Sequence, residues 1–368
     1  MLLSDFDYHL PSELIAQEPT NPRDHARLML INRVSKEISH HHIYDLPNLV
    51  PPNYYIVANN TKVFPARLIG YKPTGGRVEI LLTSPLGHSL YRCISKPGLK
   101  TGDVVVMRTA LKRNSRLQAE KGSSADERTV LKGTIISSTG YERIIKFNQE
   151  ESLLRTTLSQ LGTMPTPPYI KKLLGNAADY QTIYAKHGFS AAAPTAGLHF
   201  TPGLLKAIKL DHDWLELTLN VGLGTFLPVK EDRVEDHHMH AESYTISPTL
   251  SSHVLSLTSS HHKLLAIGTT TMRALESNVA LCHRVTAGAY ATDIFIYPPY
   301  KFQRVDALLT NFHLPGSTLL MLVSAFCSFP QTTHPFTTFK DSLLGHAYAE
   351  AIHENYRFFS FGDAMLII

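Results

Sequence analysis

The sequence contains little cysteine and no long apolar run, and both features exclude classes of protein. The three cysteines, Cys93, Cys282 and Cys327, lie far apart without a C-x-x-C pair, which indicates neither a disulfide framework nor a zinc ribbon. The longest apolar run, residues 319–326, is far shorter than the roughly 20 residues of a membrane span, so we expect a buried helix there. The N-terminus lacks a basic region followed by an apolar stretch, so we expect no signal peptide and a cytoplasmic location.

The composition is that of a folded protein with room for two domains. Of its 368 residues, 43% are hydrophobic and 18% are charged, which disfavours disorder. The net charge of +4 permits a polyanionic partner without demanding one. We expect a monomer that does not associate with membranes.

Two patterns of secondary-structure signals alternate along the chain. Residues 1–67 and 150–368 carry alternating strand and helix signals, which predict the two parts of an α/β sandwich domain. Residues 68–149 are a series of short β-like runs separated by glycine-rich or polar turns, which predict a small inserted antiparallel β-barrel. Basic residues are spread through this barrel, and such charges usually form a solvated face.

Four residues are predicted to cap helices in the α/β domain. Ser12 stands before Glu13-Leu-Ile-Ala16, Thr201 before Pro202, Ser317 before the apolar run, and Asp341 before the last helical pattern. Their side-chain oxygens can accept hydrogen bonds from the first turn of a helix, and proline is favoured at the first helical position.

Five loops rich in glycine, threonine, histidine or asparagine interrupt apolar runs. They are residues 192–199, 221–225, 268–271, 310–316 and 361–363. A strand that leads into such a loop and then into a helix places backbone donors and short side chains at one edge of an open sheet, where ligands bind in α/β proteins. We therefore predict one composite site and an enzyme with a multi-part substrate.

Histidines near these loops are candidates for proton transfer. His199 precedes a helix start, where the helix dipole favours the neutral imidazole that can accept a proton. His237, His238, His240 and Glu242 form a cluster whose spacing matches no established zinc pattern, so we expect no metal. This cluster can instead supply a general base or a set of hydrogen-bond donors, or it can form a solvated loop. A structural role is the alternative for His199.

Two loops offer groups for a nucleoside or an anion. The loop with Gly222 and Gly224 lacks the third glycine of a dinucleotide fingerprint, so a plain tight turn is its alternative, although Thr225 can contact an adenosine. Thr269 and Thr270 begin a helix, which is a natural seat for a carboxylate or phosphate.

Other polar residues suit recognition of a base, sugar or phosphate. Asn311 and His313 flank an aromatic residue, with a turn packed on the core as the alternative. Arg273 and Glu276 lie three apart on one helix, so they can pair with each other. The basic residues Arg23, Arg27, Lys62 and Arg67 lie close to Asn59, Asn60 and Thr61, a mixture suited to phosphate contacts.

Longer motifs point to a family. They include Asp5-Phe-Asp-Tyr8, Pro65-Ala-Arg67, Tyr180-Gln181, residues 192–201, Gly224-Thr-Phe226, His238-Met-His240, Gly268-Thr-Thr270, residues 310–315 and residues 356–365. Over essentially its whole length the chain resembles the S-adenosylmethionine:tRNA ribosyltransferase-isomerases of the queuosine pathway. The resemblance implies an α/β domain with an inserted β-barrel, which agrees with the two domains predicted from the strand and helix patterns.

The resemblance also implies the reaction. S-adenosylmethionine would donate its ribosyl group to the aminomethyl group of 7-aminomethyl-7-deazaguanine at the anticodon wobble position of tRNA. The products would be epoxyqueuosine in tRNA, adenine and methionine. An S-adenosylmethionine-dependent RNA methyltransferase and a non-catalytic RNA-binding protein are the alternative hypotheses.

Such a reaction needs a base and an acid with separated pKa values. The candidates for the base are His199, His240 and Glu242, and His313 is the candidate for the acid that assists adenine. For the donor we expect Gly222, Gly224, Thr225, Thr269, Thr270, Asn311 and Asp363, and for tRNA we expect Arg23, Arg27, Lys62, Arg67, Arg273 and Arg357.

Some residues depart from the family pattern. Asn60 and Lys62 stand where the family commonly has aspartate and arginine, and Asn220 stands where a histidine often precedes the glycine turn. Asn60 lacks a carboxylate and Lys62 lacks the bidentate fork of arginine, but the five loops remain largely intact.

Overall fold

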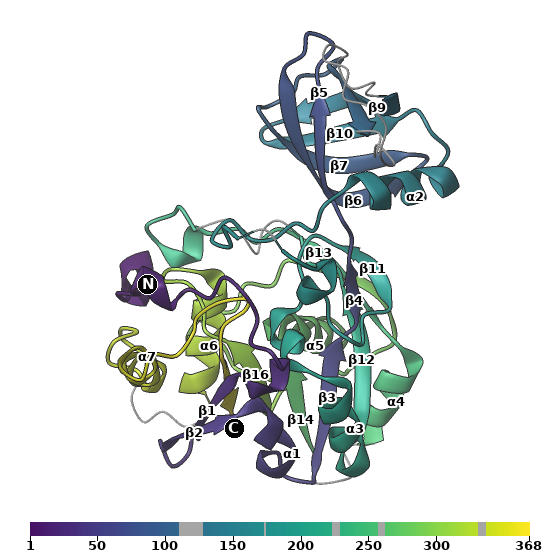
Figure 1. Cartoon of the computed structure of the whole chain (residues 1–368). Helices are drawn as coiled ribbons and strands as arrows, with labels where there is room; N and C mark the ends of the chain where they lie inside the picture. The colour runs from purple at the N-terminus through teal and green to yellow at the C-terminus, as the bar shows by residue number, and fades with distance from the viewer. Residues whose placement is uncertain (110–127, 173, 223–228, 257–261, 330–335) are drawn as a thin grey trace, which may run out of the picture. The chain divides into compact units, whose positions relative to one another are not determined.

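The computed structural model describes all 368 residues except 110–127, 173, 223–228, 257–261 and 330–335 (Figure 1). The chain divides into two compact units, one of residues 1–62, 166–188 and 192–368, and one of residues 63–165 and 189–191. We call them the α/β unit and the barrel unit. Their architectures confirm the predicted fold class, an α/β domain and a small closed antiparallel barrel.

The α/β unit is built on a nine-stranded mixed sheet (Figure 1). Its strands are, in spatial order, β15 (Gly288–Thr292), β13 (Glu242–Ile246), β12 (Trp214–Leu219), β3 (Tyr54–Asn59), β14 (Lys263–Ile267), β16 (Ala307–Asn311), β17 (Ala364–Ile367), β1 (Arg27–Ile31) and β2 (Ile38–His42). The four strands β12, β3, β14 and β16 are parallel to one another. Because parallel strands buried on both faces need apolar residues on both, their sequences read as nearly continuous apolar runs.

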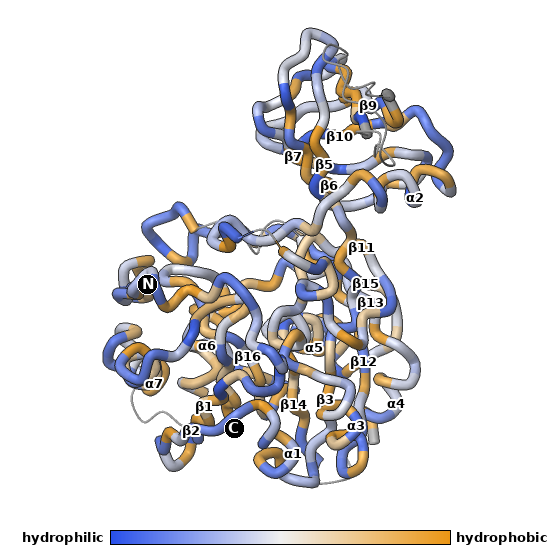
Figure 2. The backbone as a smooth tube through the Cα atoms, viewed as in Figure 1, coloured by the Kyte–Doolittle hydropathy of each residue, from blue (hydrophilic) through white to orange (hydrophobic). Residues whose placement is uncertain are grey.

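Helices cover both faces of this sheet. Apolar side chains of α4 (Pro248–Ser256), α5 (Thr269–Cys282), α6 (Thr318–Ser328) and α7 (Leu343–His353) belong to one core cluster, and those of α1 (Leu46–Leu49) and α3 (Pro202–Asp211) belong to a second. Apolar segments accordingly follow the strands and α6 in Figure 2. No helix in the described part of the chain has the length and apolar character that a bilayer crossing requires.

Two of the four predicted helix caps are confirmed. The hydroxyls of Thr201 and Ser317 accept hydrogen bonds from the backbone N–H groups of Leu204 and Leu320. The prediction for Asp341 is wrong, because the neighbouring Ser342 caps α7 and accepts from the N–H of Gly345. The prediction for Ser12 is wrong, because Ser12 is itself the first residue of a short 3-10 helix with Pro11 at the cap position. Short 3-10 helices connect the elements: η1 (Leu3–Phe6), η2 (Ser12–Leu14), η3 (Arg23–His25), η4 (Ile43–Asp45), η5 (Ala177–Tyr180), η6 (Thr195–His199) and η8 (Val234–Asp236).

In its described residues, the barrel unit is a closed six-stranded barrel with one helix. Its strands, in spatial order, are β10 (Glu142–Phe147), β7 (Leu90–Lys96), β6 (Arg77–Gly87), β5 (Arg67–Tyr71), β8 (Val104–Thr109) and β9 (Arg128–Thr139). The helix α2 (Glu151–Leu161) contributes Leu154 and Leu158 to the barrel core, so the compact unit extends beyond the predicted segment 68–149. The short strands β4 (Thr61–Val63) and β11 (His187–Ser190) pair in a separate two-stranded sheet.

Candidate active site

The predicted loops of the α/β unit converge on one edge of its sheet. The carboxyl ends of β3, β12, β14 and β16 share this edge because the four strands are parallel. Strand β17 runs antiparallel to β16, with Ala364 beside Asn311, so Asp363 lies at the same edge. Strand β13 runs antiparallel to β12, with Tyr244 beside Leu219, which brings Glu242 there as well. We call this side of the sheet the active edge.

A cavity of about 260 Å³, open to solvent, lies at the active edge. Its aromatic lining residues are Tyr169, Tyr180, Phe312 and Phe359. Its polar lining residues are Thr195, Thr269, Thr270, Thr310, Asn311, His313, Ser317 and Ser360. A mostly apolar wall with a few convergent polar groups is the usual build of a site for a small organic molecule.

Asn311 connects the cavity wall to the residues behind it. Its side-chain oxygen accepts from the Thr195 hydroxyl at 2.9 Å, and its amide nitrogen lies 3.1 Å from His199 Nε2. The same nitrogen donates to the main-chain oxygen of Asp363 at 3.4 Å. Because both ends of the amide are bound, Asn311 is held in one orientation.

His199 lies behind Asn311 and is not one of the residues that line the cavity. Burial lowers its pKa to about 4, and the nearby Arg357 guanidinium acts in the same direction. The ring is therefore neutral at pH 7, as predicted, but its Nε2 accepts the Asn311 amide proton. This lone pair is occupied, which favours a positioning role for His199 over the predicted role as a base.

His313 is part of the cavity wall. Its Nε2 lies 2.9 Å from the Thr310 hydroxyl, and its backbone N–H donates to the Tyr348 hydroxyl at 2.8 Å. Burial lowers the pKa of His313 to about 3. The free protein therefore presents a neutral His313 ring at pH 7, which is not the protonated form that an acid requires.

Glu242 and Arg273 form an ion pair in which both side chains are almost completely buried, at 2% and 3% exposure. The second Glu242 oxygen accepts from the backbone N–H of Gly222 at 2.8 Å. The suggested pairing of Arg273 with Glu276 is wrong, because Glu276 instead accepts from the backbone N–H groups of residues 303–305. Glu242 and Arg273 therefore anchor the start of the loop after β12, and neither lines the cavity.

Asp363 acts as a clamp between two chain segments. Its two carboxylate oxygens accept from the backbone N–H groups of Arg27 and Arg357, each at 2.8 Å. Burial raises the pKa of this carboxyl group, while those N–H groups and the two guanidinium groups oppose the shift. Both oxygens are used by the fold, and Asp363 does not line the cavity.

Three of the predicted tRNA-binding arginines hold chain segments together. Arg23 donates to the main-chain oxygens of Gln181 and Ala178, and Arg357 donates to Thr20 and to the main chain of Glu18. Arg27 donates to the main chain of Glu354 at 2.7 Å. These contacts stabilise the surroundings of Asp363.

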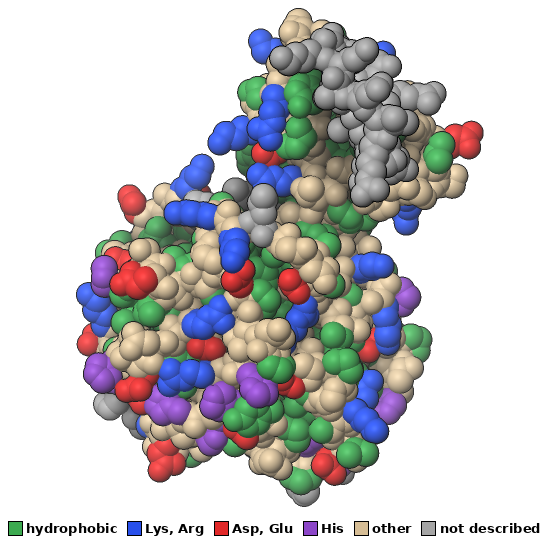
Figure 3. All heavy atoms as spheres, viewed as in Figure 1, with side chains coloured by type: hydrophobic (Ala, Val, Ile, Leu, Met, Phe, Trp, Pro, Cys, Tyr) green, Lys and Arg blue, Asp and Glu red, His purple; other side chains and the backbone are tan. Residues whose placement is uncertain are grey.

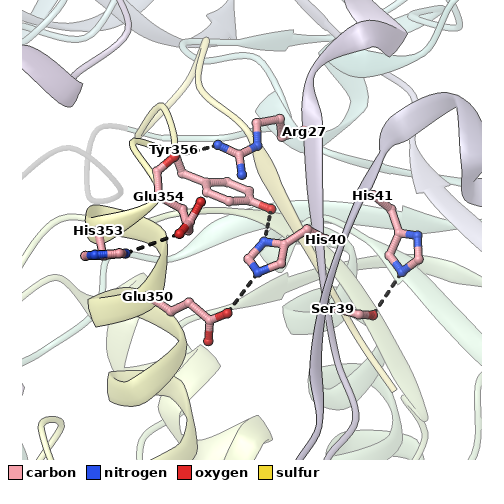
Figure 4. A network of polar contacts seen from close by, with 8 residues as sticks. All are labelled: Arg27, Ser39, His40, His41, Glu350, His353, Glu354 and Tyr356. Carbon is pink, nitrogen blue, oxygen red and sulfur yellow. Dashed lines mark hydrogen bonds and ion pairs between the residues drawn. The ribbon is translucent and has the colours of Figure 1, made fainter.

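Figure 4 shows how Arg27 is held on its outer side. Its guanidinium lies 3.8 Å from the centre of the Tyr356 ring, and the Tyr356 hydroxyl lies 2.8 Å from His40 Nδ1. The other nitrogen of His40 lies 2.8 Å from Glu350 on α7. The network thus fixes β1 and β2 against the C-terminal end of α7.

The remaining predicted residues are spread more widely. His240 is exposed and does not line the cavity, and Lys62 is exposed at the end of the α/β unit. Arg67 belongs to the barrel unit and pairs with Glu79 at 2.7 Å. Gly224 and Thr225 fall within 223–228, outside the described residues. Among the described residues, no three His, Cys, Asp or Glu side chains lie close enough together to hold a metal ion.

Several lining residues were not among the predicted site residues. Thr195 lies in the loop 192–199, and Ser317 was interpreted only as a helix cap. Tyr180, Phe359 and Ser360 stand in motifs that carried the family resemblance. The sequence contained these signals, but periodicity and spacing alone do not show that the side chains line a cavity.

A protein-family comparison agrees with this geometry. The family model described as queuosine biosynthesis protein matches residues 3–367. The chain belongs to the queuosine biosynthesis family. Two curated relatives named S-adenosylmethionine:tRNA ribosyltransferase-isomerase match it over 100% of both chains, from Moorella thermoacetica at 42% identity and from Pelotomaculum thermopropionicum at 44%.

A solved structure of the queuosine biosynthesis family supports the fold assignment. The crystal structure of S-adenosylmethionine tRNA ribosyltransferase from Thermotoga maritima is 33% identical to this chain, with a TM-score of 0.52. The match covers 99% of this chain and 100% of the other. The predicted family is thereby confirmed over the full length.

The departures from the queuosine biosynthesis pattern lie outside the cavity lining. The Asn60 amide donates to Glu216 at 3.0 Å, and its oxygen accepts from the Thr218 hydroxyl at 2.6 Å. An aspartate at position 60 would face the Glu216 carboxylate, so asparagine fits this network better. Asn220 accepts from Thr61 at 3.2 Å and donates to Ser243 at 3.2 Å, so it too serves local structure.

Proposed function

We propose that this protein is an S-adenosylmethionine:tRNA ribosyltransferase-isomerase. It transfers and isomerises the ribosyl group of S-adenosylmethionine onto the aminomethyl group of 7-aminomethyl-7-deazaguanine at the tRNA wobble position. Epoxyqueuosine in tRNA, adenine and methionine are the products. Cytoplasmic action as a monomer is part of this proposal, as is action without a metal.

The observation that carries the proposal is the cavity at the active edge, in a chain related to these enzymes over its whole length. The partly exposed Tyr169 offers aromatic surface for the adenine ring of the donor. Thr269 and Thr270, at the start of the 14-residue helix α5, offer hydroxyl groups and backbone N–H groups for the methionine carboxylate. Asn311 lines the cavity, and its side-chain oxygen, which accepts one hydrogen bond from Thr195, has a second lone pair for a ribose hydroxyl.

His313 is the strongest candidate for proton transfer. Of the four predicted catalytic residues, it is the one that lines the cavity. The sulfonium of the donor makes the adjacent ribose methylene acidic, so a base is required there. Burial keeps the His313 ring neutral in the free protein, which is the form that a base requires, although the lowered pKa makes the ring a weaker base. We assign His199, Glu242 and Asp363 positioning roles because the fold already occupies their polar atoms.

The experiment is incubation of the full chain with acceptor tRNA and S-adenosylmethionine, followed by nucleoside mass spectrometry and quantification of free adenine. Epoxyqueuosine with equimolar adenine and methionine supports the proposal. Formation of S-adenosylhomocysteine would instead indicate a methyltransferase, and tRNA binding without any donor turnover would indicate an RNA-binding protein. A His313→Gln variant should lose adenine release, and full activity in that variant would remove His313 from the proton-transfer step.

A further inference from the structure

The two units carry opposite net charge. The barrel unit contains 16 Lys and Arg against 8 Asp and Glu, a net charge of +8, and the α/β unit contains 19 against 23, a net charge of −4. Without residues 110–127 the barrel unit still has 12 basic against 5 acidic residues. The modest net charge of the whole chain therefore conceals a strongly basic small unit.

Strand register gathers part of this charge on one outer face of the barrel. Arg77 on β6 pairs with Tyr71 on β5, Tyr71 pairs with Val106 on β8, and Val106 pairs with Lys132 on β9. Arg108 lies two residues beyond Val106 on the same face, with its guanidinium 5.8 Å from the centre of the Tyr71 ring. We call Arg77, Tyr71, Arg108 and Lys132 the barrel row.

The barrel row faces solvent. Arg77, Arg108 and Lys132 are exposed, whereas the residues between them along the strands, such as Val78 and Leu131, fill the barrel core. Lys and Arg side chains gather on one flank of the barrel in Figure 3. This alternation leaves basic groups on the outside of three of four neighbouring strands, with Tyr71 on the fourth.

Four of the acidic residues in the described part of the barrel unit are directed elsewhere. Glu79, Asp103, Glu142 and Glu151 are engaged by other basic residues, Arg67, Lys72, Arg92 and Arg155. Arg77 and Lys132 form no ion pair with any acidic residue in the described part of the chain. The barrel row therefore presents cations and an aromatic ring to an incoming anionic partner.

We propose that the barrel row is a docking surface for the phosphate backbone of the substrate tRNA. This inference rests on the proposed function, because it takes tRNA as the partner. Cations that neutralise phosphates release counterions, so they supply affinity that does not depend on sequence. The Tyr71 ring beside Arg108 offers a surface for a ribose or base, which is common where proteins bind RNA.

The test compares three triple variants of the full chain. R77Q/R108Q/K132Q removes three charges from the barrel row, and R77K/R108K/K132R keeps them. K206Q/K301Q/K340Q removes three exposed charges from the α/β unit and serves as the matched control. The measurements are the KM for tRNA, the KM for S-adenosylmethionine, and the dependence of tRNA affinity on salt concentration.

We expect R77Q/R108Q/K132Q to raise the KM for tRNA about tenfold and to reduce the slope of log affinity against log salt by about two. The KM for S-adenosylmethionine should stay within about twofold, since the donor cavity lies in the α/β unit. The charge-conserving variant should keep the KM for tRNA within about twofold of the wild type.

An unchanged tRNA KM and salt slope in R77Q/R108Q/K132Q, or an equal effect in the control, would overturn the inference while leaving the proposed function intact. Absence of turnover in the wild type would overturn the proposed function instead. The inference would then be decided by tRNA binding and its salt slope alone, because these need no turnover. Circular dichroism of each variant checks that the barrel remains folded.

Discussion

Two layers of polar residues meet at the active edge. One layer lines the cavity, and the polar atoms of the other are hydrogen-bonded within the protein. Thr269, Thr270 and His313 belong to the cavity wall. Glu242 and Asp363 stand behind it, with their carboxylate oxygens bound by backbone N–H groups and, for Glu242, by Arg273. Both layers are built from residue types that catalyse reactions, yet one can meet a ligand and the other holds the loops in place.

The comparison teaches that a buried charge near a cavity is not by itself a catalytic group. A carboxylate that already accepts two or three hydrogen bonds from the fold has little capacity left for a substrate. The wall therefore should respond to mutation through substrate affinity and rate, and the layer behind it through folding stability. The following predictions separate these two responses.

The largest expected effect is on stability, in Glu242→Ala. Removing this carboxylate leaves the Arg273 guanidinium buried without its ion-pair partner and the Gly222 N–H without its acceptor. We expect the free energy of unfolding to fall by about 3–5 kcal/mol, measured by urea denaturation. The control Glu18→Ala, which removes an exposed pair with Lys172, should cost less than about 1 kcal/mol. A comparable small loss in both variants would contradict the support role of Glu242.

The next effect is a loss of stability at mildly acidic pH. The pKa of His199 is lowered from 6.5 to about 4, and that of His313 from 6.5 to about 3. Between these values and 6.5 the unfolded state binds more protons than the folded state, so stability is complete above pH 6.5 and falls as the pH falls. Each histidine contributes a slope of about 1.4 kcal/mol per pH unit in that range.

The measurement is urea denaturation at about pH 7.5 and about pH 5.5 for the wild type, His199→Gln and His313→Gln. Each variant should show a pH-dependent loss smaller than that of the wild type by about 1 kcal/mol. Because buried Asp363 has a raised pKa and contributes with the opposite sign, the difference between wild type and variant is the relevant quantity. Identical losses in all three proteins would show that neither ring is neutral because of burial.

The sequence predicted the meeting of the loops better than the roles of their residues. Parallel β-strands with short polar loops bring Gly268, Asn311 and their neighbours to one edge whatever the details of packing. The barrel could be predicted because turn signals separate its short strands. Both features depend on local patterns that the sequence displays directly.

The division between wall and support could not be predicted in this way. The pairing of Glu242 with Arg273 depends on the spatial order of β13, β12, β3 and β14, which local periodicity does not contain. The contact between His199 and Asn311 joins residues 112 positions apart. The predicted cap of α7 was wrong by one residue. Asp341 and Ser342 can both accept a hydrogen bond from the first turn of the helix, and only packing decides between them.

The smallest predicted effect is the sharpest test of the comparison, because it uses two neighbouring threonines. Thr270 lines the cavity, whereas the Thr271 hydroxyl is buried and donates to the main chain of Ile267 at 2.7 Å. Thr270→Val should raise the KM for S-adenosylmethionine about tenfold, equivalent to about 1.4 kcal/mol of binding. Its cost in stability should stay below about 1 kcal/mol, because the Asn59 amide loses only a 3.3 Å hydrogen bond and keeps the one to the main chain of Leu219. Thr271→Val should cost about 1 kcal/mol of folding free energy and leave that KM unchanged. The reverse pattern would mean that the carboxylate of the donor does not lie at the start of α5.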